Sequence, residues 1–379
     1  MHYIIINPAS RSGKGIEIWK ELEPIMTERD VKHHTIYSSY PGHIYEIVRK
    51  LCEKLNENSS LVLKIIVLGG DGTINEALQG VTDFSRVLLG YIPTGSSNDL
   101  ARDLGYPSDP KELLDIILEG EVKRTMDMGV LTYHNIKGSI SYGNPEMIRE
   151  NYDTSQVCDK HNTSQTCEGG DASQVCESDD TFQVSANPDI TDSANILESS
   201  CNNNLVTRRF LTSCGMGFDA AVCEEVSRTT TKKIWNLLGL GKLTYLNVAL
   251  RQIIGAKSIP VDMFLDDNEP IHLNRFLFIA AMNHRYEGGG FKFCPDAVDN
   301  DNSLDLCVVG DLPKPKMLMA IPTAFKGKHF MFKNIDAYRA SKIRLKADEP
   351  LWIHTDGEVY YQSDDIEISV VPSVIRFLA

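Results

Sequence analysis

Short strand-like and helix-like segments alternate along the first third of the sequence. Runs rich in Ile, Val and Leu have the length of buried strands, and most are followed by a segment with the periodicity of an amphipathic helix. The expected strands are 3–6, 35–38, 61–68 and 87–92, and the expected helices are 16–28, 43–55, 74–80 and 98–104. This order predicts a parallel sheet with crossover helices, which is a Rossmann-like, doubly wound α/β domain.

Beyond about residue 121 the pattern changes to β-rich segments with few helices. The expected strands are 125–131, 210–214, 259–265, 276–281, 304–309, 342–345, 351–355 and 366–371. They predict an antiparallel β-sandwich, with one helical hairpin around 232–254. The expected fold class is therefore α/β plus all-β, with an N-terminal domain over 1–121 and a C-terminal domain over 122–379.

Residues 145–205 fit neither pattern. They carry 12 acidic residues against two basic ones, and a nine-residue repeat spaces Cys158, Cys167 and Cys176 evenly. A segment with so little apolar material cannot offset the ordering entropy of its backbone, which favours a disordered acidic insertion within the second domain. A metal-binding or redox role for the three cysteines is the alternative, although this spacing matches no zinc-ligand pattern.

Charge and composition exclude some classes of protein. The 379-residue chain has a net charge of −14, which argues against a protein that neutralises nucleic-acid phosphates. Its apolar runs are far shorter than the ~20 residues of a membrane-spanning helix, and its start lacks the form of a signal peptide, so a cytoplasmic protein is expected. The nine cysteines form no C-x-x-C pair and are expected to be reduced and mostly structural.

The strongest functional signal is Gly69-Gly70-Asp71-Gly72-Thr73, which lies where the predicted strand 61–68 ends and a helix begins. Open parallel sheets bind ligands beyond the carboxyl ends of their strands. The glycines let backbone N–H groups approach a phosphate chain, and Thr73 and the helix start add donors and a favourable dipole. Since the charge of Asp71 repels phosphate, this residue is expected to face Mg²⁺ or its water shell. A tight turn without a ligand is the alternative.

Two further loops follow strands of the same predicted sheet and should line the same edge. Residues 7–15 combine small residues with two cations, but they are not a Walker A loop because Pro8 stands where the first glycine is required. Residues 93–99 offer hydroxyls suited to phosphate or ribose, and Asp99 lies near a helix start. Each loop taken alone is equally typical of an ordinary connection or helix cap. Three such loops at one edge favour a phosphate-binding site.

Three later motifs have more than one interpretation. The G-x-G-F-D-A segment at 215–220 mimics a dinucleotide fingerprint but lies in the β-rich domain, so a tight packing turn is favoured. The Asp356-Gly357-Glu358 turn ends a strand, where a carboxylate serves either as a hairpin cap or as a general base. Residues 295–303 offer hard oxygen ligands for Mg²⁺ or Ca²⁺ without the pattern of an EF-hand, and a solvated acidic turn is equally expected.

Together these motifs resemble the bacterial diacylglycerol kinase and YegS-like lipid kinase family, which is related to sphingosine and ceramide kinases. Five segments in family order carry the resemblance: Asn7-Pro8 with Gly13, and residues 69–76, 95–102, 215–220 and 356–358. The G-G-D-G-T loop alone is shared with NAD kinases, whereas the N-P opening, the S-x-N-D-L-A-R segment and the late D-G-E are far more specific. The resemblance spans residues 3–378 apart from the insertion.

This resemblance implies a lipid kinase with ATP in the cleft between its two domains and a lipid hydroxyl, such as that of diacylglycerol, as acceptor. The residues it places at ATP are Asn7, Pro8, Ser10, Gly13, Ser38, Gly70, Asp71, Gly72, Thr73, Asn75, Glu76, Ser96 and Asn98. It makes Glu358 the catalytic base and Asp71 the ligand of the catalytic Mg²⁺. Asp99 and Asp127 are implied to support Asp71 by hydrogen bonding. A second, structural Mg²⁺ is implied at Val298, Asp301 and Ser303, although Asp301-Asn302 departs from the usual D-G of that turn.

The same resemblance implies an enzyme of phospholipid metabolism that contacts the inner face of the membrane transiently. Because the net charge opposes attraction to anionic lipid, docking needs a local patch of basic and apolar residues. The expected patch is Lys232, Lys233, Trp235, Leu237, Leu238, Leu240, Lys242, Arg251 and Lys257, with an ordinary amphipathic helix as the alternative. An NAD kinase and a catalytically silent nucleotide- or lipid-binding regulator are the alternative functions. A homodimer is compatible with the sequence.

Overall fold

The structure is a computed structural model that describes residues 1–139, 206–228, 248, 251–253, 255–266 and 268–379. The predicted acidic insertion at 145–205 and the expected basic patch, except for Arg251 and Lys257, lie outside the described residues. So does most of the predicted helical hairpin around 232–254. The described residues belong to one compact unit.

The first part of the chain forms the predicted parallel sheet, in the strand order β2-β1-β3-β4. Its strands are β1 (His2–Ile6), β2 (His33–Tyr37), β3 (Leu63–Gly69) and β4 (Val87–Pro93). Its helices are α1 (Lys14–Glu28), α2 (His43–Glu57), α3 (Asp71–Gly80), α4 (Asp99–Leu104) and α5 (Pro110–Leu118), with 3-10 turns η1 (Ser10–Gly13) and η2 (Phe84–Arg86). All the strands and helices expected here are present, and α5 is an addition.

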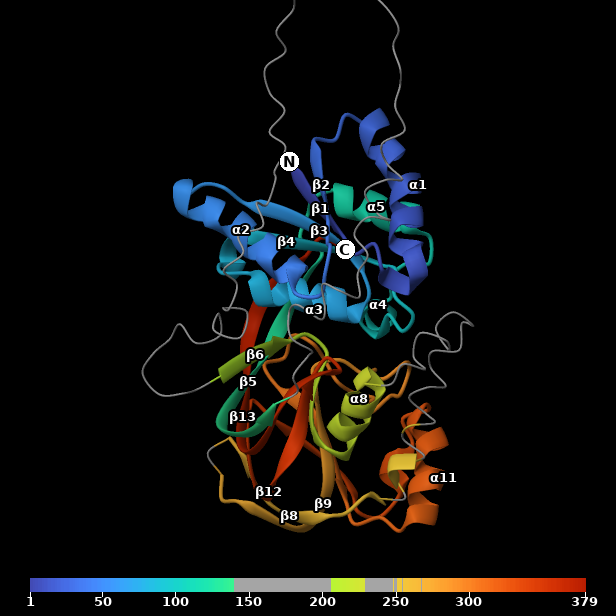
Figure 1. Cartoon of the computed structure of the whole chain (residues 1–379), viewed down its shortest axis with the longest axis vertical. Helices are drawn as coiled ribbons and strands as arrows, with labels where there is room; N and C mark the ends of the chain where they lie inside the picture. The colour runs from blue at the N-terminus through green and yellow to red at the C-terminus, as the bar shows by residue number, and fades with distance from the viewer. Residues whose placement is uncertain (140–205, 229–247, 249–250, 254, 267) are drawn as a thin grey trace, which may run out of the picture. The chain divides into compact units, whose positions relative to one another are not determined.

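Helices cover both faces of this sheet, which confirms the doubly wound arrangement. On one face, Ile4 and Ile6 of β1 pack with Trp19 of α1 and with residues of α5. On the other face, Tyr3 and Ile5 of the same strand pack with residues of α2 and α3. Alternate residues of a strand point to opposite faces, so an unbroken apolar run such as that of β1 fills two cores. Figure 1 shows α1 and α5 on one side of the strands and α2 on the other.

The second part of the chain is antiparallel, in the order β11-β10-β9-β7-β12-β13, with β5 pairing β13 and β6, and β8 pairing β12 and β9. The strands are β5 (Arg124–Ser139), β6 (Val206–Phe210), β7 (Ser213–Gly217), β8 (Ile259–Leu265), β9 (Ile271–Met282), β10 (Leu304–Gly310), β11 (Ile335–Ala340), β12 (Lys342–Thr355) and β13 (Glu358–Phe377). Described helical segments include α8 (Phe218–Arg228), α11 (Lys314–Ala324) and the 3-10 turn η4 (His329–Met331). The fold class is therefore the predicted one, α/β plus a β-sandwich.

Three details of the second part differ from the sequence-based expectation. The expected strand 210–214 is wrong, because β6 ends at Phe210 and β7 begins only at Ser213. The expected strands 342–345 and 351–355 are one strand, β12, with an irregular register against β13 between Lys346 and Leu351. The helix α11 and the strand β11 were not expected. For the strands, tertiary contacts override the local sequence pattern.

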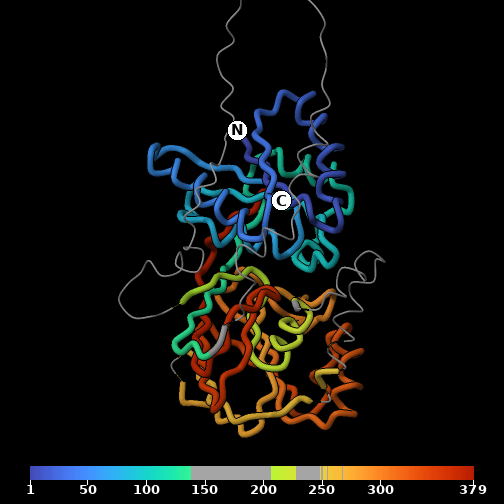
Figure 2. Tube along the Cα trace, viewed as in Figure 1, coloured from blue at the N-terminus to red at the C-terminus, as the bar shows by residue number. Residues whose placement is uncertain are grey.

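The strand β13 connects the two kinds of sheet. It pairs with β5 over most of its length, and Phe377 near its end pairs in parallel with Leu89 of β4. Leu378 then packs in the cluster under α1, so the chain ends beside strands formed near its start (Figure 2). We keep a boundary near residue 121 as a proposal, with the C-terminal residues returning to the first sheet.

Two general expectations can be compared with the described residues. None of their helices combines the length and apolar composition needed to cross a bilayer. Their cysteines, Cys52, Cys214, Cys223, Cys294 and Cys307, are free and buried. Their burial agrees with the expected structural role of these five thiols.

Candidate active site

The three loops that the sequence singles out meet at the carboxyl edge of the parallel sheet. The Asn7 amide donates a hydrogen bond of 3.1 Å to the Thr73 hydroxyl. The hydroxyls of Ser10 and Thr94 are 2.8 Å apart and buried. The fold therefore brings the loops after β1, β3 and β4 into direct contact, as predicted from the topology.

Close backbone approach explains some of the glycines in these loops. A Cβ atom on Gly95 would lie 2.6 Å from the Cα of Gly70, and one on Gly69 would lie 2.3 Å from the Cβ of Thr73. Such distances are far below contact, so side chains cannot occupy these positions. The glycines thus serve the packing of the loops themselves, in addition to any approach of a phosphate.

Asp71 begins α3 and lies beside a second carboxylate. Its Oδ2 accepts from the backbone N–H of Asp99 at 3.1 Å, and Tyr91 donates to its Oδ1 at 3.4 Å. Burial, followed by the negative charge of Asp99, raises the pKa of Asp71 to about 6. Asp99 is itself held by Arg102 at 2.5 Å and by the backbone N–H of Gly289 at 2.6 Å.

The chemistry of this donor set fits Mg²⁺. Magnesium prefers carboxylate oxygens and retains several waters, so one or two carboxylates suffice. A nearby cation would offset both burial and the repulsion between Asp71 and Asp99, which together raise the pKa. Asp71 would then be a direct ligand, with Asp99 holding it through the backbone.

The D-G-E motif forms a two-residue hairpin turn between β12 and β13. Thr355 pairs with Glu358, and the residues between them, Asp356 and Gly357, have φ angles of 50° and 81°. Positive φ at both central positions is the geometry of a type I′ turn, for which Asp-Gly is a preferred pair. The turn places Glu358 at the start of β13, where its Oε1 lies 3.2 Å from the position that a Cβ on Gly72 would take. The predicted base therefore faces the glycine loop.

Asp356 anchors this turn to the surrounding chain. Its Oδ2 accepts from the Asn75 amide at 2.6 Å and from the N–H of Leu211 at 2.9 Å. Its Oδ1 accepts from the N–H groups of Thr212 at 2.7 Å and Ser213 at 2.9 Å. These bonds break the run that resembled a single strand at 210–214. They also engage Asn75, predicted at ATP, in fixing α3 to the hairpin.

The other residues predicted at ATP have varied surroundings. The Oε1 of Glu76 accepts from the N–H of Ile44 at 2.9 Å, and burial raises the pKa of Glu76 to about 7. Ser38 is buried just after β2, and Ser96 is exposed. Asn98 has a φ of 50° and donates from its amide to the carbonyl of Gly95 at 3.1 Å. Glu76 and Asn98 therefore hold local structure, whatever they contribute to a nucleotide.

Asp127 supports the turn at 298–303 rather than bonding to Asp71. Its carboxylate accepts from the N–H groups of Asn302 and Ser373, both at 2.7 Å. In the turn, Asp301 accepts from the N–H of Ser303 at 3.2 Å and forms an ion pair with Arg339. The ion pair with Arg339 neutralises the negative charge of Asp301, which a metal ion would otherwise attract. In this arrangement the residues fit poorly the structural Mg²⁺ implied at Val298, Asp301 and Ser303.

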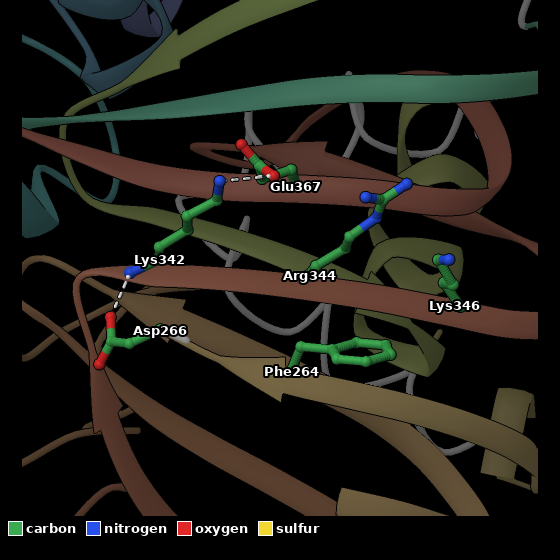
Figure 3. Close-up of a pocket in the computed structure, with 6 residues that line it drawn as sticks. All are labelled: Phe264, Asp266, Lys342, Arg344, Lys346 and Glu367. Carbon is green, nitrogen blue, oxygen red and sulfur yellow. Dashed lines mark hydrogen bonds and ion pairs between the residues drawn. The ribbon is translucent and has the colours of Figure 1, made fainter. Parts of the chain in front are cut away.

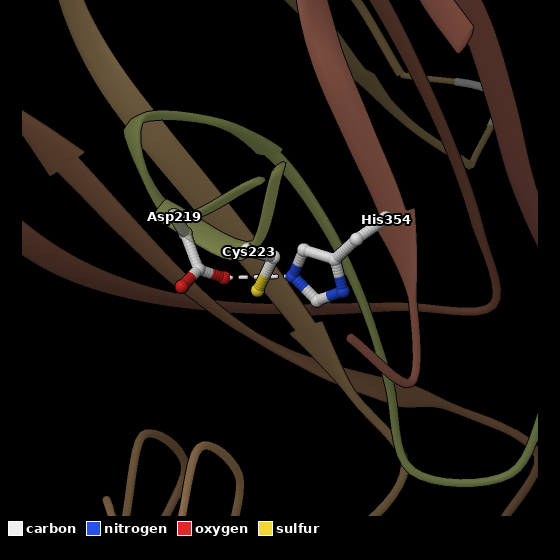
Figure 4. Close-up of side chains that lie close together, drawn as sticks. All are labelled: Asp219, Cys223 and His354. Atoms are coloured by element: carbon white, nitrogen blue, oxygen red, sulfur yellow. Dashed lines mark hydrogen bonds and ion pairs between the residues drawn. The ribbon is translucent and has the colours of Figure 1, made fainter. Parts of the chain in front are cut away.

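A buried cluster behind the D-G-E turn was not expected from the sequence. His354 donates from Nε2 to Asp219 at 2.8 Å, and Oε1 of Glu287 lies 3.3 Å away from the same nitrogen. Cys223 completes the group, which Figure 4 shows without Glu287. The N–H of Gly357 lies 3.2 Å from Nδ1. Although burial opposes it, the charges of Glu287 and Asp219 raise the pKa of His354 from 6.5 to about 9. Nε2, which faces both carboxylates, is therefore protonated and offers no lone pair to a metal. The cluster therefore fits a hydrogen-bonded clamp on the turn rather than a metal site.

This cluster accounts for the G-x-G-F-D-A motif. A Cβ on Gly215 would lie 2.2 Å from Nε2 of His354, and one on Gly217 would lie 2.4 Å from the carbonyl oxygen of Leu277. Asp219 of the motif is the partner of the imidazole. The favoured interpretation, a packing turn, agrees with this geometry. A histidine two residues before D-G-E, together with the motif's Asp, was the available sequence signal.

A separate pocket on the strands β8, β12 and β13 contains none of the predicted site residues. Figure 3 shows its lining, which is Phe264, Asp266, Lys342, Arg344, Lys346 and Glu367. Lys342 pairs with Glu367 at 3.1 Å, Arg344 pairs with Asp365 at 3.0 Å, and Lys346 lies over the Phe264 ring. With its cations paired in this way, the pocket has little to attract a phosphate.

Both the α/β part and the β-sandwich part of the chain match known protein families. Residues 2–131 match the model of the diacylglycerol kinase catalytic domain, and residues 212–379 match that of the YegS C-terminal NAD kinase beta sandwich-like domain. A Bacillus subtilis protein named "Putative lipid kinase YtlR" is 23% identical over 358 residues, covering 94% of this chain and 93% of its own length. A diacylglycerol kinase of Mycobacterium tuberculosis is 24% identical over 83% of this chain and 76% of its own length. The crystal structure of a diacylglycerol kinase from Bacillus anthracis superposes with a TM-score of 0.57 at 16% identity, covering 99% and 95% of the two chains.

Proposed function

Since the chain belongs to the diacylglycerol kinase and YegS-like lipid kinase family, we propose that it transfers the γ-phosphate of ATP to a lipid hydroxyl, with diacylglycerol as acceptor and phosphatidic acid as product. The proposal includes Mg²⁺ as the metal that accompanies ATP. It also includes a cytoplasmic enzyme that reaches its substrate at the membrane surface.

The observation that carries the proposal is the position of Glu358 opposite the start of α3. The turn presents Glu358 to Gly72, the residue that follows Asp71 in the glycine loop. A phosphoryl acceptor needs a carboxylate on one side, and the phosphate donor needs backbone N–H groups and a metal ligand on the other. Here Glu358 provides the carboxylate, and the loop that contains Asp71 and Gly72 provides the metal ligand and the N–H groups. The Glu358 carboxylate lies 3.2 Å from the position that a Cβ on Gly72 would take.

Each residue then has a defined task. The Glu358 carboxylate takes the proton of the lipid hydroxyl while that oxygen bonds to the γ-phosphorus, and the bond to ADP breaks. The loops after β1, β3 and β4 hold the phosphates through backbone N–H and hydroxyl donors. Bound Mg²⁺ would neutralise developing charge on the phosphates, and Asp71 would hold it. Asp356 keeps Glu358 in place through its four hydrogen bonds.

An NAD kinase remains the alternative, because the G-G-D-G-T loop is shared with that class and the second family match is described as NAD kinase-like. The two functions differ in the acceptor. A lipid acceptor makes activity depend on micelles or vesicles, whereas NAD is soluble and needs neither.

The test is phosphate transfer from radiolabelled MgATP to a panel of acceptors in detergent micelles. The panel contains diacylglycerol, monoacylglycerol, sphingosine, phosphatidylglycerol and, without detergent, NAD. We expect label in phosphatidic acid, lost in Glu358→Gln and Asp71→Asn and kept in Glu112→Gln, an exposed glutamate on α5. Label in NAD alone would move the protein to the alternative function. If the protein binds ATP but labels no acceptor, the result would favour the alternative of a catalytically silent regulator.

A further inference from the structure

The helix α11 carries exposed apolar side chains in addition to buried ones. Its inner face is formed by Met317 and Ala320, which pack in a core cluster of the sandwich, and by the buried Ala324. On the outer face Leu318 and Met319 are 46% and 62% exposed. A surface helix ordinarily presents polar residues outward, so large apolar side chains exposed beside Lys314 and Lys316 favour contact with something outside the chain.

Exposed apolar residues continue beyond the end of the helix. Phe325 is 45% exposed and Met331 is 75% exposed. With Leu318 and Met319, they are four of the ten large apolar side chains that are exposed in the described part of the chain. This concentration within fourteen residues separates the surface from the scattered exposure common on soluble proteins.

The charge of the same segment indicates what kind of surface its exposed apolar residues bind. Residues 312–335 hold five lysines and no acidic residue, in a chain whose net charge is −14. The five are exposed: Lys314, Lys316, Lys326, Lys328 and Lys333. Exposed apolar side chains that alternate with exposed lysines along the chain fit a surface that is anionic at its face and apolar just beneath, which describes a bilayer containing anionic lipid.

We propose that α11 and the segment that follows it, residues 314–333, form the surface by which this protein docks on an anionic membrane. We call these residues the docking surface. The inference rests on the proposed function, because a kinase of membrane lipids must reach the bilayer. It gives a location for docking among the described residues, distinct from the basic patch expected around 232–257.

The docking surface is connected to the candidate active site by a short path. The Phe325 ring stacks on that of Phe291 with centroids 4.1 Å apart, and the N–H of Lys292 donates to the carbonyl of Ala324 at 3.0 Å. Two residues before Phe291, the N–H of Gly289 donates to Asp99. The docking surface therefore contacts the segment 289–292, in which Gly289 binds Asp99, the residue whose N–H donates to Asp71.

Vesicle sedimentation without ATP tests the proposal. The vesicles are pure phosphatidylcholine, or equal parts of phosphatidylcholine and phosphatidylglycerol. Each lysine near an anionic surface contributes about fivefold to partitioning, so Lys326→Glu with Lys328→Glu should weaken binding to the mixed vesicles by about 25-fold or more. Replacing Leu318 and Met319 by Gln should weaken binding at high salt as well, where the electrostatic part is screened.

The matched control carries the same charge change elsewhere. Lys20 on α1 and Lys111 on α5 are exposed, and converting both to Glu should leave binding within about a fewfold of the unaltered protein. Thermal melts of all variants exclude a folding defect. Equal binding to both kinds of vesicle, no binding at all, or equal loss in the control and docking-surface variants would overturn the proposal.

Activity in detergent micelles distinguishes the docking proposal from the proposed kinase function. The lysine variant should still phosphorylate diacylglycerol dispersed in neutral detergent, because its active site is unaltered. If the unaltered protein binds anionic vesicles through this surface but labels no lipid in micelles, docking stands and the proposed kinase function fails. If it labels lipid but binds vesicles independently of residues 314–333, the kinase stands and the docking surface fails.

Discussion

Replacing Asp356 by Asn should destabilise the protein more than any other single polar substitution in the hairpin. The two carboxylate oxygens each accept two hydrogen bonds, at 2.6–2.9 Å. An amide has one acceptor oxygen, so its NH₂ group must face one of the two donor pairs. Two hydrogen bonds to a charged group are then lost, at about 1.5–3 kcal/mol each, and partial access of water favours the lower end. The expected loss is about 3 kcal/mol.

The backbone does not confound this substitution. Asn tolerates the positive φ of position 356 and Asn-Gly is a favoured type I′ pair, so the turn itself is preserved. Asp30→Asn is the matched control, since Asp30 also has a positive φ, 52°, and is exposed. Urea titration of both variants measures the change. The control should stay within about 0.5 kcal/mol of the unaltered protein, and a loss below about 1 kcal/mol for the Asp356 variant would refute the anchoring role.

Three further predictions concern the same region. Burial, partly opposed by the charge of His354, raises the pKa of Glu287 from 4.5 to about 8, and although burial opposes it, the charge of Glu287 raises the pKa of His354 from 6.5 to about 9. The pair therefore binds protons more tightly in the folded state, and this stability is lost as the pH rises towards 9. Urea melts of Glu287→Gln should show a smaller slope across this window, and an unchanged slope would contradict the assignment. Gly215→Ala should cost about 3 kcal/mol because its Cβ meets a buried ring nitrogen at 2.2 Å, whereas Gly255→Ala, with nothing within 4 Å, should be neutral by the same melts. Gly72→Ala should slow phosphate transfer by about tenfold or more with little change in Tm, since its Cβ lies 3.2 Å from Glu358, and an unaffected rate would argue against that contact.

The sheet and the glycine loop were predictable because their signals are local. Unbroken apolar runs such as that of β1 predict a strand buried on both faces, and the alternation of strands and helices predicts a parallel order. The meeting of the loops around Thr73 then follows from topology alone. The position of Glu358 opposite Gly72 did not follow, because 285 residues lie between them in the sequence, and only the family resemblance associated the two motifs.

The failures arise where distant residues decide local structure. The run at 210–214 has the composition of a strand, but the Asp356 carboxylate binds three consecutive N–H groups and forces a turn. The structural metal implied at Asp301 stays a prediction, and in this structure the Asp301 carboxylate pairs with Arg339 of the strand β11. Likewise α11 lacks a clear polar face, so its sequence does not show the amphipathic pattern by which helices are recognised.

The most direct test of the central claim is the rate of diacylglycerol phosphorylation by MgATP in micelles, measured for the unaltered protein and for Glu358→Gln together with ATP affinity. A general base contributes about 10²–10⁴-fold to such a reaction. We therefore expect formation of phosphatidic acid to fall by at least about a hundredfold in the variant while ATP binds as before. Undiminished lipid phosphorylation in the variant, or no lipid phosphorylation by the unaltered protein, would contradict the account.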